Sequence, residues 1–333
     1  MSHVTLSIIV GTYNRLALLK KCLEALGKGV RVDREIIVVD AGSTDGTLEY
    51  LQQCPTIRLV RDEGLIGQAK SLNRVFAMLN SDFVCWLSDD NIILDGALDS
   101  AVDILQHHSS IGMVALKVKD ITGAYTRAPY LGGIWETGIL NCNQGMLPTR
   151  LLRQLGGFDE KFRDYGIDAD LTTRVLLAGY QVVYTKRVAI HHYRDHETDN
   201  WITKSNREQR LQSARDLYRS RYAPLLIPQK TFSSVENSNF KKFVSKFLLY
   251  LKGKVVKHYK ILARHLKFSL DESIVNHWLG PFFRDWYNVS HGRFISRWDL
   301  FLNLHRPYYL VQQIPDSLRL QFWTAQNSNL RNG

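Results

Sequence analysis

The sequence predicts an α/β fold in which a mostly parallel, twisted sheet is flanked by helices. Over residues 1–120, short β-branched runs alternate with amphipathic segments of helical spacing. The runs are apolar along their whole length, which is typical of parallel strands buried on both faces. Three of them are followed at once by polar stretches, and open parallel sheets bind their ligands at that edge.

The first four strands are expected where the runs LSIIV, EIIVVD, IRLV and FVCWL occur, at residues 6–10, 35–40, 57–60 and 83–87. Two helices are expected between them, at residues 15–26 and 67–79. In both segments the apolar side chains recur at spacings of three and four, which places them on one face. These elements alternate as a helix-covered parallel sheet requires.

The second part of the region is expected to be less regular. Shorter and more antiparallel strands are expected over residues 111–147, where the pieces are mixed and contain glycine. A helix that starts at Pro148, a helix over 168–178 and a strand over 180–185 follow. The alternation therefore continues to about residue 200.

Charge divides the chain into two parts. Residues 1–200 hold 21 Lys and Arg against 24 Asp and Glu, and residues 201–333 hold 22 against 8, within a net charge of +11. We therefore expect a first domain over residues 1–220 and a basic, aromatic, mainly helical extension over 221–333. Such helices suit an anionic membrane surface. Alternatively, they pack on the first domain and keep their lysines solvated.

Composition also predicts the compartment. The four cysteines are scattered without a CxxC spacing, which is typical of reduced thiols in a cytoplasmic protein. The N-terminus lacks a secretory leader pattern, and no apolar run reaches the roughly 20 residues that cross a bilayer. We expect a cytoplasmic protein, peripheral at the inner face of the plasma membrane. No nucleic-acid motif occurs, so nucleic acid is not an expected partner.

The first polar cluster is WLSDDN, at residues 86–91, which follows the fourth expected strand. Asp89 and Asp90 place two like charges side by side, and their repulsion must be offset. Carboxylate oxygens suit Mg²⁺ or Mn²⁺, and a site with few protein ligands leaves room for the phosphates of a substrate. The alternative is a cap for the helix that starts after Asp95.

The second cluster is VVDAGSTDGT, at residues 38–47. Asp40 and the backbone amides of this loop could hold a nucleotide base or ribose, because a carboxylate accepts hydrogen bonds from imide and hydroxyl groups. A well-capped loop explains the same residues without a ligand. Neither GxGxxG nor GxxxxGK[ST] occurs, so dinucleotide and P-loop sites have no motif support.

Two further clusters follow a turn and a strand. In GGFDEKFRDYGIDADL, at residues 156–171, Asp168 lies near a helix start, where it could act as a general base or as a cap. In AIHHYRDHE, at residues 189–197, His191 or His192 could complete a metal shell begun by the acidic pair. A purely structural role for the histidines is the alternative.

The order of these motifs along residues 5–200 closely resembles the family 2 glycosyltransferases, which have the GT-A nucleotide-sugar-binding fold. The resemblance implies a pocket for the nucleotide base at Thr12, Tyr13 and Asp40, a donor-site role for Asn73, and a metal and diphosphate site at Asp89 and Asp90. It implies that Asp168 is the catalytic base and that His191 or His192 binds metal. The sequence departs from the family pattern at three places, with Ser88 and Asn91 flanking the acidic pair, Leu72 before Asn73, and Ile167 before Asp168.

The resemblance implies an inverting glycosyltransferase that uses Mn²⁺ or Mg²⁺. Its donor would be a UDP-, GDP- or dTDP-linked sugar, and its acceptor a hydroxyl of a glycan, such as a lipid-linked glycan in bacterial surface polysaccharide assembly. Two other classes remain open. A sugar nucleotidyltransferase needs a glycine-rich N-terminal loop, which GTYNR does not provide. A catalytically inactive binding or scaffold protein of the same fold is the third hypothesis.

Overall fold

The computed structural model describes residues 4–123, 126, 129–133, 135, 139–194, 201–222 and 306–310. All of them belong to one compact unit, which comprises residues 1–226 and 281–333. The basic and aromatic segments over 239–301 lie outside the described residues. The predicted boundary at residue 220 therefore stays a prediction.

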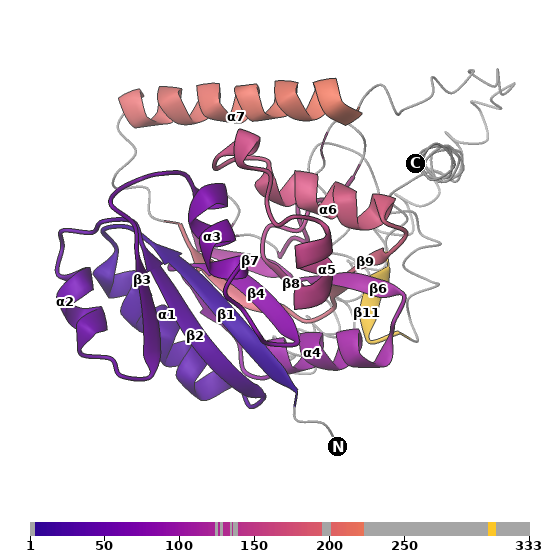
Figure 1. Cartoon of the computed structure of the whole chain (residues 1–333), viewed down its shortest axis with the longest axis horizontal. Coiled ribbons are helices and arrows are strands. Elements are labelled where there is room, and N and C mark those ends of the chain that lie inside the picture. The colour runs from indigo at the N-terminus through magenta and orange to yellow at the C-terminus, as the bar shows by residue number, and fades with distance from the viewer. Residues whose placement is uncertain are drawn as a thin grey trace, which may run out of the picture. The chain divides into compact units, whose positions relative to one another are not determined.

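The centre of the unit is an eight-stranded sheet with the order β11-β9-β6-β8-β4-β1-β2-β3 (Figure 1). Its strands are β1 (Thr5–Thr12), β2 (Asp33–Asp40), β3 (Ile57–Arg61), β4 (Phe83–Ser88), β6 (Ile111–Ala115), β8 (Gly145–Pro148), β9 (Gln181–Thr185) and β11 (Tyr308–Leu310). Only β8 and β11 run antiparallel to their neighbours. The predicted mostly parallel sheet is thus confirmed.

Helices cover both faces of this sheet, as the apolar strands predict. They are α1 (Leu16–Gly29), α2 (Thr47–Gln52), α3 (Gln68–Phe76), α4 (Ala97–His107), α5 (Thr149–Gln154), α6 (Ile167–Leu177) and α7 (Trp201–Tyr222), with a 3₁₀ turn at Glu160–Phe162. Neighbouring residues of β1 enter opposite cores. Ile9 packs in one cluster with Leu72 of α3, and Ile8 packs in the other with Leu19 of α1.

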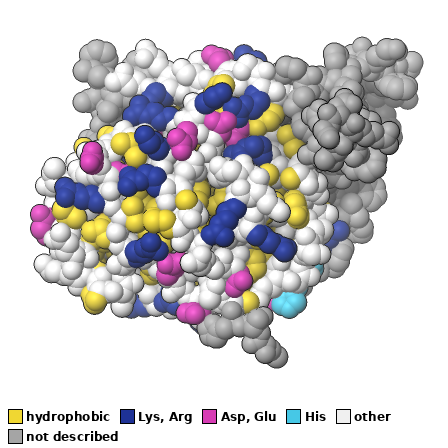
Figure 2. Space-filling view, in the orientation of Figure 1, with side chains coloured by type: hydrophobic (Ala, Val, Ile, Leu, Met, Phe, Trp, Pro, Cys, Tyr) yellow, Lys and Arg dark blue, Asp and Glu magenta, His cyan; other side chains and the backbone are white. Residues whose placement is uncertain are grey.

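On the face shown in Figure 2, Lys and Arg side chains are interspersed with hydrophobic and acidic ones. The exposed basic residues include Lys70 and Arg74 of α3 and Arg150 and Arg153 of α5. No helix among the described residues is long and apolar enough to span a bilayer. All four cysteines are free thiols, three of them buried, as their scattered spacing predicts.

A second, three-stranded sheet lies beside the main one, with the order β5-β10-β7. Its strands are β5 (Asn91–Ile93), β7 (Val118–Thr122) and β10 (Ile190–Tyr193). The central strand, β10, pairs antiparallel with β5 and parallel with β7. The sequence does not predict this sheet, because strands of three to five residues show too little periodicity.

Candidate active site

The candidate site lies at the carboxyl edge of the main sheet. Thr12 at the end of β1 is in register with Asp40 at the end of β2, and Gly11 is in register with Ser88 at the end of β4. The backbone N–H of Asp89 donates to the Gly11 carbonyl at 3.2 Å. The parallel pairing thus brings the first two polar clusters of the sequence to one edge.

The acidic pair is buried, and both of its carboxylates contact Arg15. Asp89 and Asp90 are 2% and 7% exposed. Arg15 Nη1 lies 3.2 Å from an oxygen of Asp89 and 3.1 Å from one of Asp90, and Thr12 donates to Asp89 at 2.8 Å. Burial raises the pKa of Asp89 to about 6, against the opposing effect of Arg15. Arg15 therefore offsets part of the repulsion between the two carboxylates.

Asn91 fixes the turn that presents Asp90. Its amide nitrogen donates to Asp90 at 3.1 Å, and its amide oxygen accepts from the backbone N–H of Ser88 at 3.1 Å. An aspartate at this position would have no donor for Asp90 and would add a third negative charge. The departure from the family pattern at Asn91 therefore has a structural reason.

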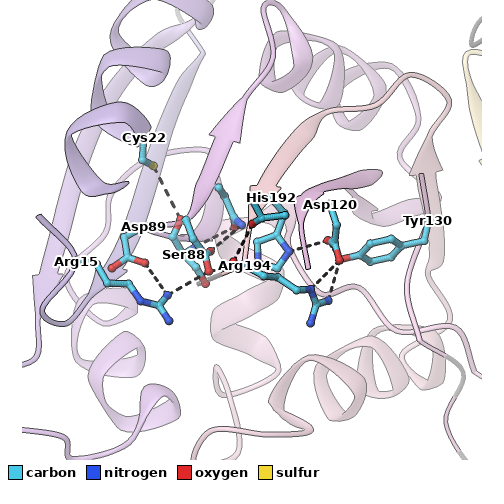
Figure 3. A network of polar contacts seen from close by, with 11 residues as sticks. Arg15, Cys22, Ser88, Asp89, Asp120, Tyr130, His192 and Arg194 are labelled. Carbon is cyan, nitrogen blue, oxygen red and sulfur yellow. Dashed lines mark hydrogen bonds and ion pairs between the residues drawn. The ribbon is translucent and has the colours of Figure 1, made fainter. Parts of the chain in front are cut away.

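The small sheet brings His192 against the acidic pair (Figure 3). Its Nε2 lies 3.3 Å from Asp90 Oδ2, and its Nδ1 lies 2.9 Å from Asp120 Oδ1. Burial disfavours the charged ring, but the two carboxylates outweigh it and raise the pKa of His192 to about 9. His191, its neighbour on β10, points to the other face of the strand, because side chains alternate along it.

Asp120 is the buried carboxylate that contacts the other ring nitrogen of His192. It also accepts from Arg194 Nε at 2.7 Å and from the Tyr130 hydroxyl at 3.0 Å (Figure 3). Burial raises its pKa, but hydrogen bonding to His192 and the charge of Arg194 lower it more. Sequence reasoning missed Asp120, Tyr130, Arg194 and Arg15. Only Arg15 carries a signal, since it follows the polar end of a strand.

The donor atoms present suit a divalent cation. A carboxylate oxygen of Asp90 and the Nε2 of His192 face each other, and Mn²⁺ accepts both types of ligand. The described residues contain no group of three or more His, Cys, Asp or Glu that could hold a metal ion. A cation at Asp90 and His192 would therefore share its coordination with oxygens of a ligand or of water.

Asp168 lies in the first turn of α6 and contacts the segment that precedes β8. The Asn141 side-chain amide donates to its carboxylate. Burial raises the pKa of Asp168 to about 6, although hydrogen bonds from backbone N–H groups and from Asn141 lower it. Part of the side chain stays accessible. A carboxylate of this kind can take a proton near neutral pH.

The pairing of β8 with β4 places Asp168 at the same edge as the acidic pair. β8 runs antiparallel to β4, with Gly145 opposite Trp86. The residues before Gly145 therefore continue past Trp86 toward the carboxyl end of β4, and Trp86 Nε1 donates to the Asn143 carbonyl at 3.1 Å. Asn141 therefore lies at the carboxyl edge of the sheet. Asp168, whose carboxylate Asn141 contacts, lies at the same edge.

The other predicted residues have separate surroundings. Asp40 is fully buried and accepts from the backbone N–H of Ser43 at 3.1 and 3.2 Å, so it caps its own loop. Tyr13 is 42% exposed. Asn73 binds the backbone N–H and carbonyl of Phe158, both at 2.8 Å, and so anchors the turn before Asp159. Ligand binding by these three residues stays a prediction.

Comparisons with known proteins bear on the family of the chain. The sequence model of glycosyl transferase family 2 matches residues 7–159. The N-acetylglucosaminyl-diphospho-decaprenol L-rhamnosyltransferase of Mycobacterium tuberculosis is 24% identical over 237 residues, which are 58% of this chain and 77% of that protein. The GalNAc(5)-diNAcBac-PP-undecaprenol beta-1,3-glucosyltransferase of Campylobacter jejuni is 32% identical over 105 residues, 28% of this chain and 32% of that protein.

A comparison with solved structures bears on the fold. S. aureus TarS 1-349 in complex with UDP-GlcNAc aligns with a TM-score of 0.51 at 17% identity, over 81% of this chain and 75% of that chain. At this identity the likeness concerns the fold alone. It confirms the predicted GT-A fold.

Proposed function

Because residues 7–159 belong to glycosyl transferase family 2, we propose that this protein is an inverting glycosyltransferase that moves a sugar from a nucleoside-diphosphate sugar to an acceptor hydroxyl. The observation that carries the proposal is the joint position of the acidic pair, His192 and Asp168 at one edge of the sheet. The donor is a UDP-, GDP- or dTDP-linked sugar. Its base would contact Thr12, Tyr13 and Asp40, and Asn73 would support the donor site through the turn that it anchors.

The diphosphate of the donor would lie at Asp89 and Asp90. Asp90 and His192 would hold a Mn²⁺ or Mg²⁺ ion, which when bound supplies positive charge to the leaving diphosphate. Asn91 and Asp120 keep these two side chains in position, at 3.1 Å from Asp90 and 2.9 Å from His192. Of the two histidines predicted from the sequence, His192 is the proposed ligand, because it faces Asp90.

Asp168 would act as the general base. Its pKa of about 6 leaves it ionised at neutral pH, yet basic enough to take the proton of the acceptor hydroxyl as that oxygen attacks the anomeric carbon. Deprotonation and attack occur in one displacement, so the configuration at the anomeric carbon inverts. A retaining route would require a nucleophilic carboxylate beside that carbon.

The proposed acceptor is a lipid-linked glycan in bacterial surface polysaccharide assembly. Two relatives are named for decaprenol- and undecaprenol-linked sugars, which supports a substrate of this class. We place the protein peripherally at the inner face of the plasma membrane. The basic extension over residues 221–333 supplies the charge for an anionic bilayer.

The assignment is tested by substituting the acidic pair. Asp90→Ala should reduce sugar transfer from the preferred donor by at least about 100-fold, because the diphosphate loses its cation site. Asp103→Ala on the exposed side of α4 is the matched control and should retain wild-type turnover. Melting temperature and circular dichroism report folding in both variants. Unchanged turnover of folded Asp90→Ala would contradict the proposed donor site at the acidic pair.

Membrane association is tested with the full chain and vesicles. Co-sedimentation should be strong with vesicles that contain anionic phosphatidylglycerol and weak with phosphatidylcholine alone. Raising the salt from 0.05 M to 0.5 M should release the protein, since the attraction falls off within a Debye length. Equal binding to both vesicle types at all salt concentrations would show that the protein does not bind anionic membranes by electrostatic attraction.

A further inference from the structure

A buried asparagine lies beside the proposed base. Asn141 is 3% exposed, and its side chain is fully engaged. Its amide nitrogen donates to the carboxylate of Asp168 and, at 2.7 Å, to Asn143 Oδ1. Its amide oxygen accepts from the backbone N–H of Gly133 at 2.5 Å. The orientation of the amide is therefore fixed by three partners from three places in the chain.

The same segment is tied to the backbone of α6. The hydroxyl of Thr172 accepts from the backbone N–H of Cys142 at 3.0 Å and donates to the Asp168 carbonyl at 2.7 Å. Gly132 packs so closely that a Cβ there would come within 2.1 Å of the Asn141 carbonyl oxygen. The segment around Asn141 is thus hydrogen-bonded to the first turn of α6 and packed closely against Gly132.

We propose that Asn141 is a positioning residue that fixes the direction of the Asp168 carboxylate for attack by the acceptor hydroxyl. This inference rests on the proposed function of Asp168. An amide N–H at this position only donates, so it always binds a lone pair of the carboxylate and restricts the rotation of the side chain. Neither the sequence motifs nor the family resemblance points to this residue.

The charge state of the base depends on the same contact. Burial raises the pKa of Asp168, and hydrogen bonds from two backbone N–H groups and, to a smaller extent, from Asn141 lower it, because a donor favours the ionised form. Without this donor the pKa of Asp168 rises, so the carboxyl group stays protonated up to a higher pH. Truncating a residue that merely filled space beside α6 would instead expose the carboxylate and lower its pKa, so the direction of the change separates the two roles.

The experiment measures kcat/KM of the full chain from pH 5 to pH 9. In Asn141→Ala the acid limb should move up by about one pH unit, so that the loss relative to wild type is about fivefold at pH 6, about tenfold at pH 5 and negligible above pH 8. Asn141→Asp preserves the shape of the side chain but opposes two carboxylates, and its limb should move further. If Asn141→Ala does not fold, Asn141→Asp still allows the same measurement.

The matched control is Thr172→Val, which removes the tie between the segment and α6 but leaves the amide donor. Its acid limb should stay at the wild-type pH, whatever its effect on stability. If the acid limb of kcat/KM stayed at the wild-type pH in both Asn141 variants while activity fell equally at all pH values, the positioning role would be wrong. Asn141 would then have a structural role only.

A second measurement separates this inference from the proposed function. The pKa of the Asp168 carboxyl is followed by carbon-13 NMR in wild type and in Asn141→Ala, without substrate. A higher value in the variant is expected, and an equal value would refute the inference whether or not Asp168 is catalytic. Full activity of Asp168→Asn would instead refute the catalytic base.

Discussion

Asp89 and Asp90 are held against each other by one guanidinium. Arg15 Nη1 lies within 3.2 Å of both carboxylates, and its side chain is one-third exposed. Without a ligand, this contact and His192 supply the positive charge that the acidic pair requires. A bound cation would supply positive charge at the same place.

This contact predicts the behaviour of Arg15→Gln. In metal-free buffer the variant should lose about 1 to 2 kcal/mol of unfolding free energy, because two buried carboxylates lose a partly solvated partner. Mn²⁺ should raise its melting temperature more than that of wild type. The measurement is thermal unfolding with and without Mn²⁺. Arg31→Gln, which removes an exposed partner of Asp95, should show no such difference, and an equal Mn²⁺ effect in all three proteins would contradict the prediction.

The pKa of Asp168 predicts the pH dependence of transfer. A base must be deprotonated, and its pKa of about 6 lies above the usual range because of burial. Below pH 6 kcat/KM should therefore fall tenfold per pH unit, and above pH 7 this group should no longer limit the rate. Steady-state kinetics on wild type checks the limb. Asp168→Asn should lack it and should retain less than about 1% of the activity.

At the scale of single residues, the sequence predicted those site residues that lie within a motif. Asp89, Asp90, Asp168 and the histidines could be identified because the order of their motifs resembles a family. Asp120 and Asn141 could not, because each lies in a short irregular segment without periodicity. Their roles come from contacts with residues 72 and 27 positions away. Such contacts are set by the tertiary fold and leave no local pattern.

The helix that carries Asp168 is anchored to α7 through a buried carboxylate. Asp170 is fully buried and binds Arg174 and Arg221 at 2.7 Å and the Tyr222 hydroxyl at 2.6 Å. Thr173 and Tyr218 add a contact of 2.7 Å between hydroxyl groups of the same two helices. The position of the proposed base therefore depends on the docking of α7.

Asp170→Ala should destabilise the protein by about 3 kcal/mol, because it leaves two partly exposed guanidinium groups and the buried Tyr222 hydroxyl without their acceptor. Urea unfolding followed by circular dichroism measures the loss. Glu208→Ala, an exposed acidic residue of α7, is the control and should change stability by less than about 0.5 kcal/mol. If both variants unfolded at the same urea concentration, Asp170 would not anchor the two helices.

Elements with strong periodicity could be predicted, and short ones could not. The first four predicted strands and the helices over 15–26 and 67–79 correspond to β1–β4, α1 and α3. The strand predicted over 180–185 and the helix over 168–178 agree with β9 and α6 to within one residue. The strands β5 and β10 depend on pairing across the fold and had no signal in the sequence, whereas β7 lies within residues 111–147, where short strands were expected.

At the scale of the whole molecule, ligand binding should appear as stability. In the presence of Mn²⁺, the preferred sugar nucleotide at 100 times its Kd should add about 2.7 kcal/mol, because it binds the native state. A thermal-shift screen of UDP-, GDP- and dTDP-linked sugars should therefore single out one nucleotide. Asp90→Ala should lose the shift for that donor. A shift that persists in this variant would place the donor elsewhere.

Asp90 and His192 stand 102 residues apart in the chain, and Thr12 and Asp89 stand 77 apart. During synthesis, the acidic doublet and Arg15 leave the ribosome long before the imidazole that completes them. At translation speeds of about 5 to 20 residues per second, this interval lasts for several seconds. Over that time Asp90 can meet Arg15 but not His192, so the acidic pair has one of its two positive partners.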